Sequence, residues 1–465
     1  MGQRHSSLLA RTCETGTHST HLFEAGLVTS ISESRAVFIW GYGREGRVVL
    51  DLVRAEAPDL AVTIVDAKRP ADLPEDVAWI EEDALPGAVR TADRPLIVKS
   101  PGVSLYDPRL DAAMKAGARL TSQTNLYFER KPAGQRVLAV TGTKGKSTTA
   151  ALLHHMLKGL NISTALAGNI GEPVITVSRE AGMVVLELSS YQIADLVHAP
   201  DAFLFLNLSN DHAPWHKGVE RYRADKARLA RLDPNTPGVM NANEARLIEY
   251  FGHQPNRIWF GTEDGFHARN GAVWFKGEAW GPIPALPGKH NALNACAALA
   301  MLDHLGFDAR AAFATLSTFA GLPHRLQTVH EAGALRFVDD GLATTPEACI
   351  NAVAAFADQP VALLLGGEER EQDYAWLADR LEAFDHIAAI LTLADNGERI
   401  VQALSAGRHA GVTRHVPEVE DAVREAAGAL PEGGVVLLSP AAPRGKAYSS
   451  FAERGAAFTA AAKAL

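Results

Sequence analysis

A glycine-rich turn between a strand and a helix limits what this chain can fold into more than any other feature. The apolar run 136–140 leads into Thr141-Gly142-Thr143-Lys144-Gly145-Lys146-Ser147-Thr148-Thr149, and helical apolar spacing then continues to Leu160. Such a turn exposes backbone N–H groups at a helix N-terminus, where the helix dipole favours a phosphate group. Lys146 is suited to offset phosphate charge and Ser147 to reach a magnesium ion. The pattern predicts a phosphate-binding turn.

The turn departs from the general pattern G-x-x-x-x-G-K-[ST] at one position. Val140 stands five residues before Gly145, where that pattern has a glycine. The alternative interpretation is therefore an ordinary strand–helix turn with a surface lysine. The strand before the turn and the helix after it favour phosphate binding.

Strand patterns alternate with helical ones along nearly the whole chain, which predicts parallel sheets with ligands at the carboxyl ends of the strands. With 465 residues, the chain is too long for one hydrophobic core. We expect an α/β fold of three domains: a Rossmann-like one, a central one like the P-loop ATPases, and a second Rossmann-like one. The expected bounds are a tail at 1–34 and domains at 35–131, 132–321 and 322–465. Short aromatic runs with glycine turns predict a small antiparallel insertion at residues 250 to 285.

The composition excludes several classes of partner. The net charge of -9 offers no basic surface to nucleic acid or to an anionic membrane. The sequence has no apolar run of about 18 residues that would predict a membrane span. Cys13, Cys296 and Cys349 are far apart and form neither a disulfide framework nor a zinc motif. We expect a protein of the reducing cytoplasm.

A second glycine-rich turn opens the N-terminal domain. The run 41–46 matches G-x-G-x-x-G after a buried strand, and Asp66 lies 20 residues beyond Gly46. This pattern is typical of dinucleotide-binding domains. By itself it suggests a nicotinamide-dependent oxidoreductase.

Short polar motifs follow the apolar segments of the rest of the chain. They are Gly168–Gly171, Leu186–Gln192, Asn207–His212, Tyr222–Lys226, Leu286–Asn291 and Leu322–Arg325. In this order, and with the first turn in the compact form T-G-T-x-G-K-[ST], they resemble the Mur ligase family and its folylpolyglutamate-synthase relatives. The resemblance covers nearly all of the chain from residue 36.

The resemblance implies an ATP site with two magnesium ions. The implied ATP-binding residues are Gly142, Thr143, Lys144, Gly145, Lys146, Ser147, Thr148, Asn291, Arg325 and Asp340. The implied metal ligands are Ser147, Glu187, His212 and a carbamylated Lys226, and the implied catalytic residues are Lys146, His212 and Lys226. The C-terminal domain is expected to close over ATP bound to the central one, which would exclude water.

The residues by themselves leave other roles open for this set. Glu187 ends a buried strand, where a carboxylate has to be paired or bound to metal, and a core or helix-capping role is the alternative. Lys226 at the end of Tyr-Arg-Ala-Asp-Lys would ordinarily be a solvated helix residue. A carbamylated Lys226 would offer a carboxylate to a second magnesium ion, whereas an unmodified lysine would repel it. A core or helix-capping role is also the alternative for His212, for which the resemblance implies that it orients either the first metal or the substrate carboxylate.

In the muramoyl ligases of this family, the N-terminal domain holds the UDP part of the substrate. Ser100-Pro101-Gly102 resembles the [SN]-P-G loop of that uridine site, so the resemblance favours UDP over a nicotinamide dinucleotide. Helix N-terminal amides and a carboxylate would serve either ligand. The implied UDP-binding residues are Gly43, Arg44, Glu45, Asp66, Ser100, Pro101, Gly102 and Asn169.

The C-terminal motifs depart from those that hold D-glutamate in the family. Leu342 stands where D-S-K-A-T-N has lysine, Arg370 where G-G-x-x-K has lysine, and Arg444 where a serine would bind the side-chain carboxylate. Arginine offers a carboxylate a planar fork that lysine lacks, so the groups that hold glutamate have moved. We expect a pocket of Thr344, Arg370, Arg444 and Phe451, in the subgroup that adds L-glutamate. Neutral drift within a D-glutamate enzyme is the alternative.

The activity implied by the resemblance is ATP-dependent addition of glutamate to UDP-N-acetylmuramoyl-L-alanine, a precursor of peptidoglycan. The alanyl carboxylate would attack the γ-phosphate of ATP, and the amine of glutamate would then attack the acyl phosphate. We expect a monomer without a nucleic-acid or membrane partner. Two other classes stay open: a nicotinamide-dependent oxidoreductase and a non-catalytic ATP-binding partner of a larger assembly.

Overall fold

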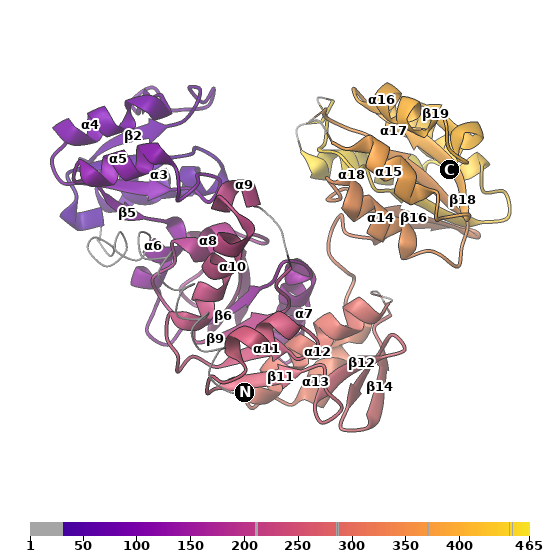
Figure 1. Ribbon diagram of the computed structural model, residues 1–465, viewed down its shortest axis with the longest axis horizontal. Coiled ribbons are helices and arrows are strands. Elements are labelled where there is room, and N and C mark those ends of the chain that lie inside the picture. The colour runs from indigo at the N-terminus through magenta and orange to yellow at the C-terminus, as the bar shows by residue number, and fades with distance from the viewer. Residues whose placement is uncertain are drawn as a thin grey trace, which may run out of the picture. The chain divides into compact units, whose positions relative to one another are not determined.

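The computed structural model describes residues 31–209, 213–284, 286, 288–369, 372–445, 447–448 and 450–465. They form two compact units (Figure 1). Unit 1 runs to Ile283 and includes Lys289–Ser317, and unit 2 comprises Pro284–Gly288 and Thr318–Leu465. Both units are α/β with parallel sheets, so the predicted fold class is confirmed. The predicted domain bounds stay predictions.

The first sheet of unit 1 is parallel, with strand order β3-β2-β1-β4-β5. Its strands are β1 Ala36–Trp40, β2 Ala61–Val65, β3 Ala78–Ile80, β4 Pro95–Lys99 and β5 Arg119–Thr121. Its helices are α3 Arg44–Glu56, α4 Leu85–Thr91, α5 Pro108–Lys115 and α6 Gln123–Arg130. α3 and α6 contribute to the core on one face, and α4 and α5 to the core on the other. Burial on both faces explains the continuous apolar runs of the central strands. Ile31, assigned to the tail from the sequence, is buried in the first of these cores.

The second sheet of unit 1 is also parallel and carries the glycine-rich turn of the central region. Its strand order is β11-β10-β9-β6-β8-β7. The strands are β6 Arg136–Thr141, β7 Thr164–Gly168, β8 Met183–Glu187, β9 Ala202–Phe205, β10 Gly238–Asn241 and β11 Arg257–Phe260. The helices are α7 Lys146–Gly159, α8 Ser190–Ala194, α9 Ala213–His216, α10 Val219–Ala227, α11 Ala245–Phe251, α12 Lys289–His304 and α13 Ala309–Thr315. α8, α10 and α11 contribute to the core on one face, and α7 packs against α12.

A three-stranded antiparallel sheet forms part of the insertion predicted at residues 250 to 285. Its strands are β12 Phe266–Arg269, β13 Ala272–Phe275 and β14 Glu278–Pro282. The prediction was wrong for residues 257–260, which form β11 at the edge of the parallel sheet, in register with β10. The reason is that an apolar run of four residues fits a parallel edge as well as a hairpin.

Unit 2 has one six-stranded sheet, in the order β15-β16-β20-β17-β18-β19. Its strands are β15 Gln327–Ala332, β16 Leu335–Asp339, β17 Val361–Leu365, β18 Ile387–Thr392, β19 Thr413–His415 and β20 Gly434–Leu438. Only the pair β15–β16 is antiparallel among these described strands. The helices are α14 Pro346–Ala354, α15 Tyr374–Leu381, α16 Gly397–Leu404, α17 Val419–Gly428 and α18 Phe451–Lys463. α14 to α16 contribute to one core and α17 and α18 to the other.

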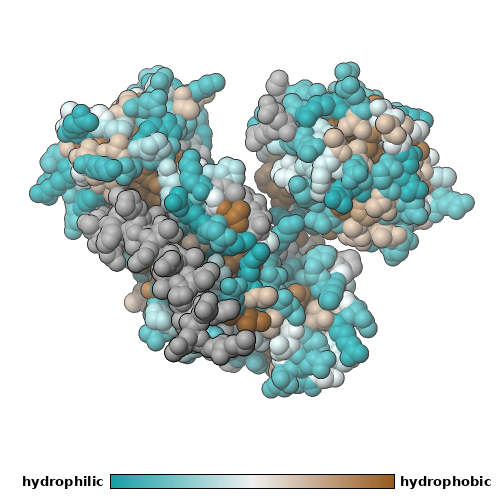
Figure 2. All heavy atoms as spheres, in the orientation of Figure 1, coloured by the Kyte–Doolittle hydropathy of each residue, from teal (hydrophilic) through white to brown (hydrophobic). Residues whose placement is uncertain are grey.

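The visible surface is mainly hydrophilic, with apolar residues in small separate patches (Figure 2). The large apolar residues exposed in the described part of the chain are Ile248, Val412, Phe451 and Leu465. No described helix combines the length and the apolar character that crossing a lipid bilayer requires.

A buried ion pair joins the two parallel sheets of unit 1. Lys99 ends β4, and its Nζ lies 2.9 Å from Oδ2 of Asp195, which follows α8. Both side chains are inaccessible to solvent. Asn125 of α6 adds two bonds across the same junction: its Nδ2 donates to the carbonyl of Asp195, and its Oδ1 accepts the N–H of Val197. These contacts fasten the first sheet to the segment that follows Glu187.

We predict that Lys99→Met lowers the free energy of unfolding of unit 1 by about 3–5 kcal/mol, because the Asp195 carboxylate stays buried without its cation. Urea unfolding followed by tryptophan fluorescence measures the change. Lys115→Met is the matched control, since Lys115 pairs with Asp111 one turn away on the exposed face of α5. The control is expected to cost less than about 0.5 kcal/mol. Equal losses in the two variants would contradict the prediction.

Candidate active site

The glycine-rich turn that is predicted to bind phosphate, called the phosphate turn below, lies between β6 and α7, as the sequence predicts. Gly142 and Gly145 have φ of +156° and +83°, a region that residues with a side chain rarely adopt. A Cβ at Gly145 would lie 2.7 Å from Oδ1 of Asn294, so the turn is also closely packed. The first N–H groups of α7 have no acceptor within the helix and are available to an anion. Nζ of Lys146 folds back over the turn and donates to the carbonyl of Thr143 at 3.0 Å.

Asn207, beyond the end of β9, holds the outer part of this turn. Its Oδ1 accepts the backbone N–H groups of Thr143 and Lys144, each at 2.9 Å, and its Nδ2 donates to the carbonyl of Lys144. The Thr143 hydroxyl lies 2.8 Å from the hydroxyl of Tyr222. Asn207 therefore supports the turn from outside by accepting the N–H groups of Thr143 and Lys144. From the sequence, Asn207 is identified only as part of a motif, without this role.

Glu187 ends β8 and is completely buried. Its Oε1 accepts a hydrogen bond from Nδ2 of Asn169 at 3.0 Å. Its Oε2 is buried and has no hydrogen-bond partner in the described part of the chain. An unpartnered carboxylate oxygen in an apolar strand end is costly, so the site fits a bound cation.

Lys226 on α10 is buried, with 1% of its surface exposed. Its Nζ donates to the carbonyl of Gly142 at 2.9 Å, which places the side chain at the phosphate turn. The alternative of a solvated helix residue is therefore wrong, because packing of α10 against the turn removes Lys226 from water.

Asn291 and His212 are further predicted site residues of the central region, and the structure describes only Asn291. Asn291 is buried in the first turn of α12, three residues before Asn294, whose amide abuts Gly145. His212 lies outside the described residues. Within the described ranges, no group of three or more His, Cys, Asp or Glu side chains is close enough to hold a metal ion. Magnesium is commonly held by one or two carboxylates together with phosphate oxygens, which is the arrangement that Glu187 permits.

The second glycine-rich turn, at the start of α3, is braced by two of the predicted UDP-binding residues. Oδ2 of Asp66 accepts the N–H of Tyr42 at 2.9 Å, and its Oδ1 accepts the N–H of Ala67. The hydroxyl of Ser100 donates to the carbonyl of Gly41 at 2.8 Å. The turn and the loop Ser100-Pro101-Gly102 are therefore adjacent, as a common ligand site requires.

Arg44 and Glu45 of this turn reach the second sheet. Arg44 donates to the carbonyls of Gly168 and Gly171, at 2.7 Å and 3.0 Å. Oε1 of Glu45 accepts a hydrogen bond from Nε2 of Gln192 at 3.1 Å. Burial and the nearby Asp195 carboxylate raise the pKa of Glu45 to about 7.

In unit 2, Asp340 and Ser439 meet at the carboxyl ends of β16 and β20. The two strands are neighbours, with Asp339 paired to Leu438. Ser439 Oγ donates to Oδ2 of Asp340 at 2.8 Å, and the N–H of Leu326 donates to its Oδ1. Burial raises the pKa of Asp340 to about 7, against the opposing effect of these hydrogen bonds. Arg325 lies near enough to favour the ionised form.

The predicted glutamate-binding residues are more exposed than this frame. Thr344 and Arg444 are exposed, and Arg444 donates to the carbonyl of Tyr448. Phe451 is 43% exposed and meets the ring of His324 edge-on at 5.5 Å. Arg370 lies outside the described residues.

Comparison with known proteins places the whole chain. Residues 140–302 match the Mur ligase middle domain, and residues 324–442 match the Mur ligase glutamate ligase domain. The chain is 38% identical to the UDP-N-acetylmuramoyl-L-alanine–L-glutamate ligase of Xylella fastidiosa strain Temecula1, over 92% of this chain and 95% of the relative. It is 36% identical to the protein of the same name from Xanthomonas axonopodis pv. citri, over 92% and 94%.

The chain belongs to the Mur ligase family. It is thus an ATP-dependent amide-bond ligase, as the motifs predict. The structure of the UDP-N-acetylmuramate–alanine ligase MurC from Thermotoga maritima has the same fold, with a TM-score of 0.58 and 20% identity over 92% of this chain and 99% of that one. Family membership decides against the oxidoreductase alternative.

One buried residue of this Mur ligase received no role from the sequence. Arg454 on α18 is buried and donates to the carbonyls of Gly341, Gly366 and Pro443, at 3.0, 3.4 and 3.2 Å. These carbonyls belong to the loops that follow β16, β17 and β20. A single guanidinium therefore ties together the three loops that carry the glutamate-site motifs. The F-x-x-R-G ending of the sequence was the available indication.

The raised pKa of Asp340 gives unit 2 of this Mur ligase a pH-dependent stability. An unfolded aspartate titrates near pH 4, so between about pH 4 and pH 7 the folded state holds a proton that the unfolded state has lost. The contribution is therefore favourable at low pH and is lost as the pH rises through about 7. We predict that Asp340→Asn gains thermal stability over the wild type at about pH 8 relative to about pH 5.

Thermal unfolding of the protein without ligands measures this difference. Asp385→Asn, at an exposed position of unit 2, is the control. A difference between Asp340→Asn and the wild type that is the same at both pH values would contradict the prediction.

Proposed function

We propose that this Mur ligase adds L-glutamate to UDP-N-acetylmuramoyl-L-alanine in the synthesis of peptidoglycan precursors. The observation that carries the proposal is its 36–38% identity, over 92% of the chain, to proteins named as L-glutamate ligases of this substrate. The departures at Leu342 and Arg444 from the D-glutamate motifs support the same stereochemistry. The D-glutamate enzyme of the family is the second candidate.

The phosphate turn supports a role in activating the acceptor carboxylate. ATP would lie with its phosphates on the first turn of α7, where Lys146 offsets charge on the oxygens of the transferred phosphoryl group. The alanyl carboxylate attacks the γ-phosphate, and ADP leaves. The amine of glutamate then attacks the acyl phosphate, and phosphate and the proton lost by the amine leave as the amide forms.

Two magnesium ions are proposed at Ser147, Glu187, His212 and a carbamylated Lys226. Bound there, magnesium would neutralise phosphate charge. Oε2 of Glu187, which lacks a partner among the described residues, is a suitable ligand. A carbamate on Lys226 keeps one N–H on Nζ, so the bond to the carbonyl of Gly142 would survive the modification. A substrate linked to UDP and a requirement for ATP fit a reaction in the cytoplasm.

We predict that Lys146→Ala lowers ATP-dependent phosphate release by about a thousandfold, because transition-state charge on the phosphoryl group loses its cation. A coupled phosphate assay with UDP-N-acetylmuramoyl-L-alanine, glutamate and magnesium measures the rate. Lys158→Ala is the control, since Lys158 is exposed in the last turn of the same helix. Near wild-type turnover by Lys146→Ala would refute the assignment of the phosphate turn.

We also predict that the wild-type enzyme releases phosphate with L-glutamate at least about tenfold faster than with D-glutamate, the difference expected when one bidentate contact is lost. The assay supplies each enantiomer separately at equal concentration. Faster release with D-glutamate would reject the L-glutamate assignment and leave the ligase class intact.

A further inference from the structure

Arg44 and Glu45, adjacent residues of the N-terminal glycine-rich turn, make hydrogen bonds to segments that belong to the second parallel sheet and its helix α8. Arg44 uses both terminal nitrogens of its guanidinium on the carbonyls of Gly168 and Gly171. Gly168 is the last residue of β7, and Gly171 lies in the loop that follows it and carries Asn169. The planar fork of arginine suits such a double contact.

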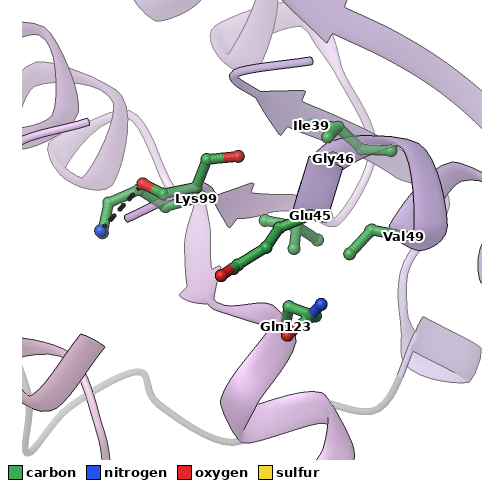
Figure 3. Close-up of a pocket in the computed structure, with 8 residues that line it drawn as sticks. Ile39, Glu45, Gly46, Val49, Lys99 and Gln123 are labelled. Carbon is green, nitrogen blue, oxygen red and sulfur yellow. Dashed lines mark hydrogen bonds between the residues drawn. The ribbon is translucent and has the colours of Figure 1, made fainter. Parts of the chain in front are cut away.

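Glu45 contacts α8, which follows Glu187 in the chain. Its carboxylate accepts a hydrogen bond from Nε2 of Gln192. The other end of this amide, Oε1, accepts the N–H and the hydroxyl of Ser189, each at 3.0 Å, and this fixes the direction of the amide. Glu45 also lines a recess of the N-terminal sheet with Lys99 and Gln123 (Figure 3).

The two contacts converge on Glu187. Asn169, in the loop held by Arg44, donates its side-chain amide to Oε1 of Glu187 and its backbone N–H to the Glu187 carbonyl, both at 3.0 Å. Ser189, held through Gln192 by Glu45, lies two residues after Glu187. The segments on both sides of the buried carboxylate are thus fastened to one turn of the N-terminal sheet.

We propose that Arg44 and Glu45 are positioning residues. They hold Glu187 in place relative to the N-terminal glycine-rich turn, which would receive the acceptor substrate UDP-N-acetylmuramoyl-L-alanine. The proposal rests on the proposed function and changes the role expected for these two side chains, which the sequence assigned to UDP. A carboxylate directed at a pyrophosphate would repel it, whereas Glu45 is turned toward Gln192. The backbone of the turn and the loop at Ser100 remain for the UDP group.

The kinetic test separates positioning from ligand contact. Arg44→Ala and Glu45→Ala are assayed for kcat and for the KM of UDP-N-acetylmuramoyl-L-alanine, with L-glutamate, ATP and magnesium. We expect kcat to fall about tenfold for Glu45→Ala, and about threefold for Arg44→Ala because its side chain is partly in water, with KM changed less than about twofold. Glu45→Gln keeps an acceptor for Gln192 and is expected to restore most of kcat.

The control is Arg54→Ala, at a position farther along α3. It removes an exposed ion pair between Arg54 and Asp76 and should leave kcat unchanged. A rise in the KM of the acceptor of tenfold or more with unchanged kcat would overturn the proposal and make the two side chains UDP ligands. Unchanged kcat and KM in both variants would also overturn it.

A second measurement does not need turnover. Hydrogen–deuterium exchange of residues 164–172 and 187–192 should be faster in Arg44→Ala and Glu45→Ala than in the wild type and in Arg54→Ala. If the wild-type enzyme fails to release phosphate, the proposed function fails, and the exchange measurement still tests the junction. Equal exchange in all four proteins would overturn the positioning role.

Discussion

The chemistry of unit 1 depends on the register between two parallel strands. Val140 of β6 is paired with Glu187 of β8, so the phosphate turn starts next to the position of the buried carboxylate. A slip of one residue would turn Glu187 to the opposite face of the sheet, because side chains alternate along a strand. The hydroxyl of Thr141 continues the alignment past the strand ends by donating to the carbonyl of Leu188. This register places Glu187 beside the start of the turn, and Lys226 reaches the same turn from α10 through the carbonyl of Gly142.

Burial explains which partners the charged side chains of unit 1 contact. A charge removed from water needs a partner close by, and each buried charged residue here marks a place where two segments meet. Lys226 joins α10 to the phosphate turn, and Lys99 joins β4 to the segment after α8. Glu187 and Asp195 each have one carboxylate oxygen without a hydrogen-bond partner in the described residues, but Asp195 is paired with Lys99, whereas Glu187 has no ion pair there. The missing ion pair makes Glu187 suited to a bound cation, whereas Lys99 and Asp195 hold the two sheets together.

Unit 2 combines buried side chains that connect its loops with exposed side chains that the motifs assign to glutamate. Arg454 and Asp340 are buried and join neighbouring loops through backbone carbonyls and the Ser439 hydroxyl. Arg444 and Phe451, which the motifs assign to glutamate, are exposed. An exposed side chain can change without loss of packing, and Arg444, one of the departures from the D-glutamate pattern, is exposed.

The amino-acid sequence by itself determined the order of strands and helices and the position of both glycine-rich turns, because periodicity, glycine placement and the absence of helix breakers act over a few residues. It also indicated Glu187, since a carboxylate at the end of an apolar strand is conspicuous. The burial of Lys226, the use of Asn207 and Arg454 as supports, and the reach of Arg44 and Glu45 into the second sheet came only from the tertiary structure. In each case the decisive contact joins segments far apart in the chain. No local pattern encodes such a contact, because it depends on which elements pack together.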